Sequence, residues 1–343
     1  MDRLFAAAMG KVLATKDMKK ALDVDMFTPL AHPPSIARPT QSVADFVVSF
    51  LRLRRGDMLL RPICVVGIVS SPQLAFWVAF LNAYFDVASF SSLPIPALAR
   101  NRRLLQCNAI DATGRAQLAL HGSHVLDAVS RHVPPASGVA LVLIHEPLGT
   151  DGGGGHVTTT TTELSATING KLVVVLPLSH LPSIHAQAQR VLQVILQHLG
   201  LVHCPFFDCV MNASKPRDEA ASSTARVLDV CPLCLRKVSL AQPQFNVVRR
   251  YNALLVVVTD DDTHRNASAA WDDLRSWCTE RLAFITDGNG MPHSHQEATN
   301  HAHGSDGHRH IHSRTTCAVD ISKLRLLKQR LNKRSSHARG RRC

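Results

Sequence analysis

No stretch of this sequence approaches the roughly 20 consecutive apolar residues that a membrane-spanning helix needs. The longest apolar run, residues 74–81, has the length of a buried core segment. A secretory signal pattern is also lacking, because residues 1–22 mix lysine and arginine with alanine and leucine. Such a segment could serve as a weak amphipathic presequence, but Asp2 and Asp17 favour a surface helix. We therefore expect an intracellular protein without membrane association, in the cytoplasm, with the nucleus and the mitochondrion as alternatives.

Acidic residues are missing from the end of the chain. Residues 321–343 contain nine Lys or Arg and no Asp or Glu. These nine positive charges are about three quarters of the net charge of +12. The rest of the sequence is near neutral, so charge does not predict a nucleic-acid-binding face on the folded part. Basic tails are usually solvated, and weak contact with nucleic acid or another polyanion is the alternative. Seven histidines within residues 293–312 indicate either loose metal binding or a low-complexity insertion without function.

Apolar runs and helical periodicity predict the organisation between the termini. Residues 1–57 are mixed in composition, and four prolines between positions 29 and 39 predict an irregular extension. Residues 286–343 form the histidine-rich and basic tail. Strands are predicted at 62–69, 138–144 and 171–176, and helices at 73–85, 184–199 and 268–285. Residues 246–258 fit either a helix or a strand, while the glycine and threonine runs at 152–155 and 158–162 predict a low-complexity loop. Alternating strands and helices indicate an α/β or α+β fold with a mixed sheet.

Four of the nine cysteines fall within one stretch of 31 residues: Cys204, Cys209, Cys231 and Cys234. The spacing, C-x4-C and then C-x2-C after 21 residues, is typical of a tetrahedral structural zinc site made of four thiolates. Disulfides are disfavoured because the other five cysteines are scattered singly and nothing indicates secretion. Independently buried thiols would not explain the paired spacing. A thioredoxin-type redox pair would place its C-x-x-C at a helix start after a strand, without a second pair.

Just before these cysteines, the sequence retains some positions of an extended zinc-protease motif, His-Glu-x-x-His-x-x-Gly-x-x-His. In that motif two histidines one helical turn apart bind zinc, the glutamate is the general base, and a glycine ends the helix before the third histidine. Gly200 and His203 fit the motif, but Gln193 and Gln197 stand at the two helical histidines and Val194 stands at the base. An amide oxygen is a weak zinc ligand and valine cannot accept a proton, so these degenerate positions predict no catalytic residue.

Neighbouring histidines do not replace the missing ligands. His198 follows Gln197, but one helical step turns a side chain by about 100° away from the motif face. His185 lies about 12 Å before Gln193 along a helix axis. His145 precedes a glutamate, yet a proline follows at once and would break the helix that the chemistry requires.

The combined pattern resembles the archaemetzincins, a family related to the metzincin zinc metallopeptidases. Their motif runs His-Glu-x-x-His-x-x-Gly-x-x-His-Cys-x4-Cys-x-Met, with a Cys-x-x-Cys further on. The matching positions are, in order, Gly200, His203, Cys204, Cys209, Met211, Cys231 and Cys234. The resemblance covers roughly residues 60–260 and is most specific from 190 to 255.

This resemblance implies a metzincin-like mixed sheet above the active-site helix, with an upper part at 58–200 and a lower part at 201–285. It implies one structural zinc ion on the four cysteines, a Met-turn at Met211, the end of the active-site helix at Gly200, and a residual catalytic-zinc ligand position at His203. The favoured function is an archaemetzincin-like pseudopeptidase whose cleft binds peptides or a protein partner. An active metallopeptidase or aminopeptidase with a rearranged site is the alternative, and a nucleic-acid-associated or scaffold protein acting through the basic tail is the second alternative.

Overall fold

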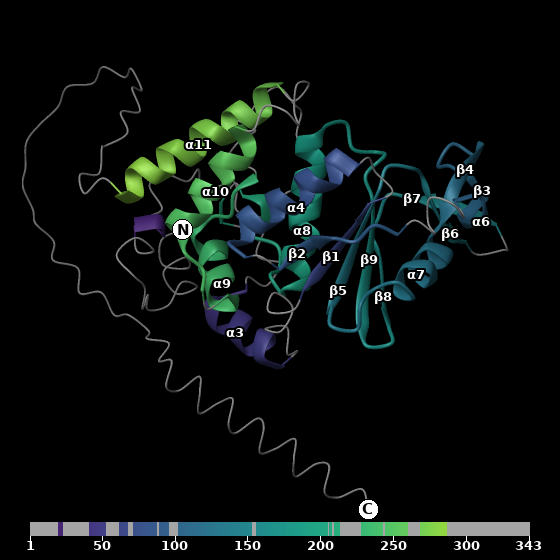
Figure 1. Cartoon of the computed structure of the whole chain (residues 1–343), viewed down its shortest axis with the longest axis horizontal. Coiled ribbons are helices and arrows are strands. Elements are labelled where there is room, and N and C mark those ends of the chain that lie inside the picture. The colour runs from purple at the N-terminus through teal and green to yellow at the C-terminus, as the bar shows by residue number, and fades with distance from the viewer. Residues whose placement is uncertain are drawn as a thin grey trace, which may run out of the picture.

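The computed structural model describes most of the central part of the chain. The described residues are 20–22, 41–52, 62–67, 71–87, 89–95, 102–152, 156–204, 206–207, 209–212, 228–242, 244–259 and 268–286. Within them the chain forms a mixed α/β fold with two sheets, which confirms the predicted fold class (Figure 1). The basic tail, the seven histidines and most of residues 1–57 lie outside the described residues, although helix α3, Val43–Arg52, falls within that N-terminal stretch.

The main sheet has five strands in the order β2-β1-β5-β9-β8. Its strands are β1 Ile63–Gly67, β2 Phe90–Ser92, β5 Val139–Ile144, β8 Leu164–Ile168 and β9 Lys171–Pro177. Neighbouring strands are parallel from β2 to β9, and β8 pairs antiparallel with β9 at one edge. All residues of β5 are buried, as expected for a parallel strand covered on both faces. The strands predicted at 62–69, 138–144 and 171–176 are therefore confirmed.

Side chains of the central strands alternate between two hydrophobic cores. Val65 and Leu141 face the larger core, which includes α4, Ser71–Phe85, and α8, Ile184–His198. Val66 and Val142 face the smaller core, which includes α7, Gly122–Ser130. Figure 1 shows α7 on one side of the sheet and α4 and α8 on the other. The helices predicted at 73–85 and 184–199 are confirmed, and the buried side chains of α8 belong to the larger core.

The smaller sheet is a closed arrangement of four short strands. These strands are β3 Gln106–Ile110, β4 Ala116–His121, β6 Leu148–Asp151 and β7 Val157–Thr160, and helix α6, Arg102–Leu105, precedes β3. Of the predicted loop at 152–155, residues 153–155 lie outside the described residues. The prediction of a loop at 158–162 is wrong for residues 158–160, because they belong to β7, which pairs antiparallel with β6. Threonine is β-branched and favours extended backbone, so a threonine run can form a strand when a partner strand is available.

Three helices form the C-terminal part of the described chain: α9 Pro232–Ala241, α10 Val247–Thr259 and α11 Ser268–Thr286. The ambiguous segment 246–258 is thus helical, and the helix predicted at 268–285 is confirmed. The α10 helix packs against α11 and α4, and α3 packs against α9. Trp271 of α11 meets Phe76 and Phe80 of α4 edge to face, which joins this part to the larger core. No helix among the described residues has both the length and the hydropathy of a membrane span.

Candidate metal centre

Helix α8 has well-defined signals at both ends. The Ser183 hydroxyl accepts a hydrogen bond from the Ala186 amide at 3.2 Å and caps the N-terminus. At the other end, Gly200 has a φ of +97°, which glycine adopts without a steric penalty. The Gly200 amide donates to the Gln197 carbonyl at 2.8 Å, and the Leu201 amide donates to the Leu196 carbonyl at 3.0 Å. These two hydrogen bonds end the helix, and the chain then turns into the segment that contains His203.

The three degenerate motif positions occupy different surroundings on α8. Gln193 is half-buried and Gln197 is exposed, whereas Val194 is only 1% exposed and belongs to the larger core. Position 194 therefore contributes to packing in this chain, where the protease motif would have a proton acceptor. A valine there stabilises the helix by burying apolar surface, and a carboxylate would have to be desolvated.

The segment that follows Gly200 is held by a side chain that the motif analysis did not single out. The Gln41 side chain donates to the Gly200 carbonyl at 3.0 Å and accepts from the Val202 amide at 3.3 Å. The Lys237 ammonium group donates to the Gln41 carbonyl at 2.7 Å and so links α9 to the same contact. His203 follows directly and is half-buried. No local pattern marks Gln41, because its partners lie about 160 residues away in the sequence.

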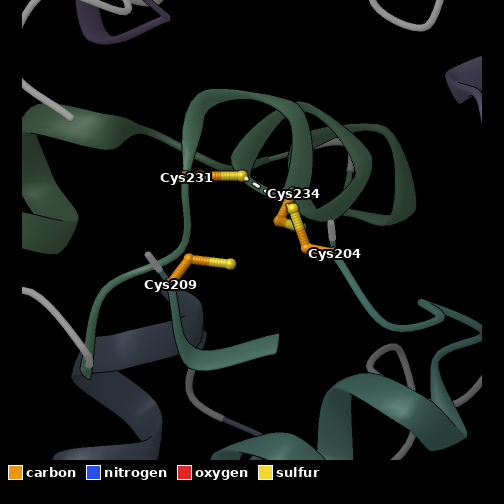
Figure 2. A group of neighbouring side chains, drawn as sticks. All are labelled: Cys204, Cys209, Cys231 and Cys234. Atoms are coloured by element: carbon orange, nitrogen blue, oxygen red, sulfur yellow. Dashed lines mark hydrogen bonds between the residues drawn. The ribbon is translucent and has the colours of Figure 1, made fainter. Parts of the chain in front are cut away.

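The four predicted zinc cysteines come together in one buried cluster, the cysteine quartet: Cys204, Cys209, Cys231 and Cys234. All four sulfur atoms lie within 4.8 Å of one another, and Figure 2 shows the side chains converging from two segments. The Cys204 and Cys231 sulfurs are 3.5 Å apart, so they are not bonded as a disulfide. Tetrahedral zinc with Zn–S distances of about 2.3 Å would separate its sulfurs by about 3.8 Å. The quartet therefore fits a tetrahedral metal ion with small adjustments.

Short-range backbone contacts position each half of the quartet. In the first half, the Cys204 amide donates to the Met211 carbonyl at 3.3 Å, and the Asn212 amide donates to the Cys209 carbonyl at 2.8 Å. Met211 is buried in the short 3-10 helix η2, Val210–Asn212, which packs against α8.

In the second half, Cys231 is the N-cap of α9 and Pro232 occupies its first turn, so Cys234 lies one turn further on the same side. This C-x-x-C does begin a helix, as a redox pair would. The adjacent Cys204 and Cys209 favour the four-thiolate arrangement instead.

The electrostatics of the quartet also favour a bound cation. Hydrogen bonds from the thiols of Cys209, Cys231 and Cys234 lower the pKa of Cys204 well below its ordinary value. Burial raises the pKa of both Cys209 and Cys231 well above theirs. Several thiolates cannot share so dry a site without a compensating charge, because desolvation and mutual repulsion oppose their ionisation. A divalent ion supplies that charge and allows all four cysteines to ionise. Within the described residues, no other group of three or more His, Cys, Asp or Glu side chains meets the geometry of a metal site.

A buried carboxylate, Asp229, lies two residues before Cys231 and was not predicted as a site residue. It accepts hydrogen bonds from Arg250 at 2.7 Å, from the Tyr251 hydroxyl at 2.6 Å and from the Trp277 indole at 2.9 Å. Burial alone would raise the pKa of Asp229, but Arg250 and the hydrogen bonds from Tyr251 and Trp277 outweigh burial and hold that pKa below its ordinary value. No sequence signal marks this group, because its partners are defined only by tertiary packing.

A serine–histidine–aspartate chain lies at the start of α7. Ser123 Oγ is 2.9 Å from His121 Nδ1, and His121 Nε2 is 3.1 Å from Asp151 Oδ1. The Asp151 side chain is 77% exposed, so solvent screens its pairing with His121. Ser123 is only two residues from His121, on the first turn of the helix. The arrangement therefore ties β4, β6 and α7 together locally and does not define a nucleophilic site.

The fold and the site together define a mixed α/β protein with a buried four-cysteine group suited to a metal ion. No protein-family model and no solved structure matches the chain significantly. Among curated proteins, archaemetzincin-2 of Rattus norvegicus is 44% identical over 102 residues, and that of Mus musculus is 32% identical over 102 residues. Each alignment covers 25% of this chain and 27% of the relative. Archaemetzincin-2 of Homo sapiens is 38% identical over 64 residues, or 19% of this chain and 17% of the relative.

These matches confirm the family resemblance that the sequence motif indicates. Part of this chain is homologous to archaemetzincins. The homologous part spans about a quarter of the length of the rat and mouse relatives.

Proposed function

We propose that this chain is an archaemetzincin-like zinc protein in which the cysteine quartet holds one structural zinc ion. The observation that carries the proposal is the convergence of four buried thiols within 4.8 Å, on the spacing that the family motif predicts. Thiolate ligands select soft or borderline ions such as zinc, and a closed four-thiolate shell leaves no position for substrate or water. A zinc ion bound there would cross-link the segment after α8 to the start of α9 and contribute to folding.

The proposal includes the metzincin type of architecture. In it, residues 58–200 form an upper part with the five-stranded sheet above α8, and residues 201–285 form a lower part that contains the quartet. The order β2-β1-β5-β9-β8 with one antiparallel edge strand is consistent with such a mixed sheet. The turn at Gly200 supports the boundary, because it ends α8 and begins the segment that leads into the quartet.

We further propose that peptidase activity by the family mechanism has been lost, and that the side of α8 that carries Gln193 and Gln197 binds a peptide or a protein partner. The support is chemical. Gln193 and Gln197 offer amides where the motif has imidazoles, and Val194 lies in the core where the motif has its base. Without a zinc-bound water of lowered pKa and without a general base, hydrolysis loses its two main sources of rate.

Metal analysis of two proteins tests the zinc proposal. We expect the full chain to bind one more zinc ion than its Cys231→Ser variant after equilibration with the same zinc buffer. The difference isolates the quartet, because the histidines of residues 293–312 contribute equally to both proteins. Equal zinc contents would refute a metal site on the quartet.

A peptidase assay separates the pseudopeptidase from an active enzyme with a rearranged site. The full chain should not cleave a mixed peptide library above the rate of a chelator-treated sample. Cleavage that disappears with chelator and returns with zinc would support the active alternative instead.

Weak binding of polyanions through residues 321–343 is a separate proposal that rests on composition alone, since these residues lie outside the described part of the chain. Removing them should abolish binding to heparin or single-stranded nucleic acid at low salt and leave the zinc content of the quartet unchanged. If the shortened protein binds polyanions as well as the full chain does, the contact does not involve residues 321–343.

A further inference from the structure

Asp229 connects the two halves of the cysteine quartet. Its carbonyl oxygen accepts a hydrogen bond from the amide of Val210 at 3.0 Å, and Val210 directly follows Cys209. In the other direction along the chain, Cys231 begins α9 two residues later. One residue therefore holds the segment that carries Cys209 beside the segment that carries Cys231.

The side chain of Asp229 is anchored to helices outside the quartet. Arg250 and Tyr251 come from α10 and Trp277 comes from α11, and all three donate to its two carboxylate oxygens. Its Oδ1 also accepts from the Val230 amide at 2.8 Å. With four donors on two oxygens, the lone-pair sites of the carboxylate are filled. The side chains of Asp229 and Arg250 are only 2% and 1% exposed, so solvent does not weaken these bonds.

Arg250 extends the anchor to the rest of the fold. Its Nε donates to the Tyr84 carbonyl of α4 at 2.9 Å, and its guanidinium lies 4.5 Å from the centre of the Tyr84 ring. Tyr84 is itself buried in the larger core. The position of Asp229 is therefore tied to α4, α10 and α11 and not only to its neighbours in sequence.

We propose that Asp229 is a positioning residue of the quartet, and that its anchoring sets how slowly a bound divalent ion leaves. The inference rests on the proposed function and concerns retention of the ion, not the identity of its ligands. A metal ion leaves by losing its thiolates one after another, so departure is slow when the ligand segments cannot move apart. Residues that orient ligands from outside a metal site typically change metal affinity by about 10–100-fold when they are replaced.

The matched control is Asp86, a second buried carboxylate paired with an arginine of α10. Its side chain is 4% exposed, and Arg249 donates to it at 2.9 Å. Asp86 also accepts from the Asn246 amide at 2.5 Å and, through its carbonyl, from Gln242 at 3.0 Å. These bonds reach the C-terminal end of α9 and the start of α10, and none links the segment of Cys209 to the segment of Cys231. Asp86→Asn therefore removes a similar buried charge without weakening the side-chain anchor of Asp229.

The experiment measures cobalt release from the full chain. Co²⁺ bound by cysteine gives a thiolate-to-metal charge-transfer band that histidine does not give. Because Cys317 follows the histidine-rich residues, the part of the band that is lost in Cys231→Ser is taken to report the quartet. Its decay is followed after an excess of chelator is added, at a temperature where circular dichroism shows every variant to be folded. We expect Asp229→Asn to accelerate the decay about 10–100-fold, and Asp86→Asn to leave it close to the wild-type rate.

Tyr251→Phe and Trp277→Phe provide milder variants in case Asp229→Asn does not fold. Each removes one hydrogen bond to Asp229 Oδ2 and keeps the charge pair with Arg250, so each should give a smaller acceleration. Wild-type decay rates in Asp229→Asn, or in both milder variants if it does not fold, would overturn the proposal. Equal acceleration by Asp86→Asn would overturn it too, because the loss of any buried carboxylate would then be enough to speed cobalt release. A wild-type protein without the charge-transfer band would refute the proposed zinc site itself, which is a distinct result.

Discussion

The cysteine quartet and the motif face of α8 lie next to each other in the sequence but differ in how complete they are. All four ligand positions of the quartet are cysteine, and the structure buries them together. Of the protease pattern, only His203, which follows α8, is a metal-binding residue, and Val194 on α8 belongs to the core. The proposed structural zinc site accounts for this difference. Replacing a structural ligand costs folding free energy, whereas replacing catalytic groups by packing residues can be neutral or stabilising.

The largest effect should come from breaking the quartet. Cys231→Ser should lose the bound zinc and with it the stabilisation by binding, which is about 4 kcal/mol when free zinc is 1,000-fold above the dissociation constant. Zinc content and urea denaturation measure the two consequences. Cys107→Ser is the control, because Cys107 is a half-buried thiol on β3, away from the quartet in the fold. A Cys231→Ser protein as stable as Cys107→Ser at saturating zinc would contradict a folding role.

A second test places the missing base back on α8. Val194→Glu should lower the free energy of unfolding at pH 7 by roughly 3–5 kcal/mol, because position 194 is 1% exposed and a carboxylate there is buried without a partner. Burial raises the pKa of such a carboxyl in the folded state, so the loss should shrink as the pH falls below that raised pKa toward the ordinary Glu pKa of about 4.3. Gln197→Glu, the same residue at an exposed position of the same helix, should change stability by about 0.5 kcal/mol or less. Similar losses in both variants would mean that Val194 is not part of the core.

Removing zinc should loosen the segments of the quartet more than the main sheet. In chelator-treated protein, we expect hydrogen exchange to accelerate at the amides of Cys204, Val210 and Asn212, whose hydrogen bonds hold the quartet segments. Amides of β5 and β9 should remain the best protected and accelerate only as far as the global free energy of unfolding falls, because these strands pair inside the main sheet between both cores. Uniform acceleration across the protein would show that zinc stabilises the fold as a whole.

The smallest change in stability should come from restoring the two helical histidines. Gln193→His together with Gln197→His should bind one additional zinc ion with His203 and change stability by about 0.5 kcal/mol or less, because Gln197 is exposed and Gln193 only half-buried. The measurement is the zinc content of this variant. The control is the zinc content of the double variant Gln193→Asn with Gln197→Asn, which adds no metal ligand. Adding Val194→Glu should complete the motif at the stability cost expected for that substitution. No additional zinc in either histidine variant would count against the alignment with the protease motif.

Local patterns predicted much of this structure. The uniformly apolar run of β5 and the periodic apolar face of α8 are properties of short segments, and Gly200 carries its own backbone preference. The paired cysteine spacing predicted the quartet for a similar reason, because each pair lies within a few residues. In contrast, β3, β4, β6 and β7 escaped prediction. Their segments mix polar and apolar residues and contain no long apolar run, although β3–β4 and β6–β7 pair locally as hairpins. The contacts that close the small sheet, β4 with β6 and β3 with β7, join segments distant along the chain.

The sequence by itself determined the ligand chemistry: four cysteines at zinc-binding spacing, and amides and a valine where a peptidase needs imidazoles and a carboxylate. Tertiary structure decided what surrounds those residues. Only folding placed Val194 in the core, set Gln41 against the turn after α8, and gave Asp229 its partners on α10 and α11. The physical reason is that residue type follows from the sequence alone, whereas burial and hydrogen-bond partners arise from contacts between segments distant along the chain.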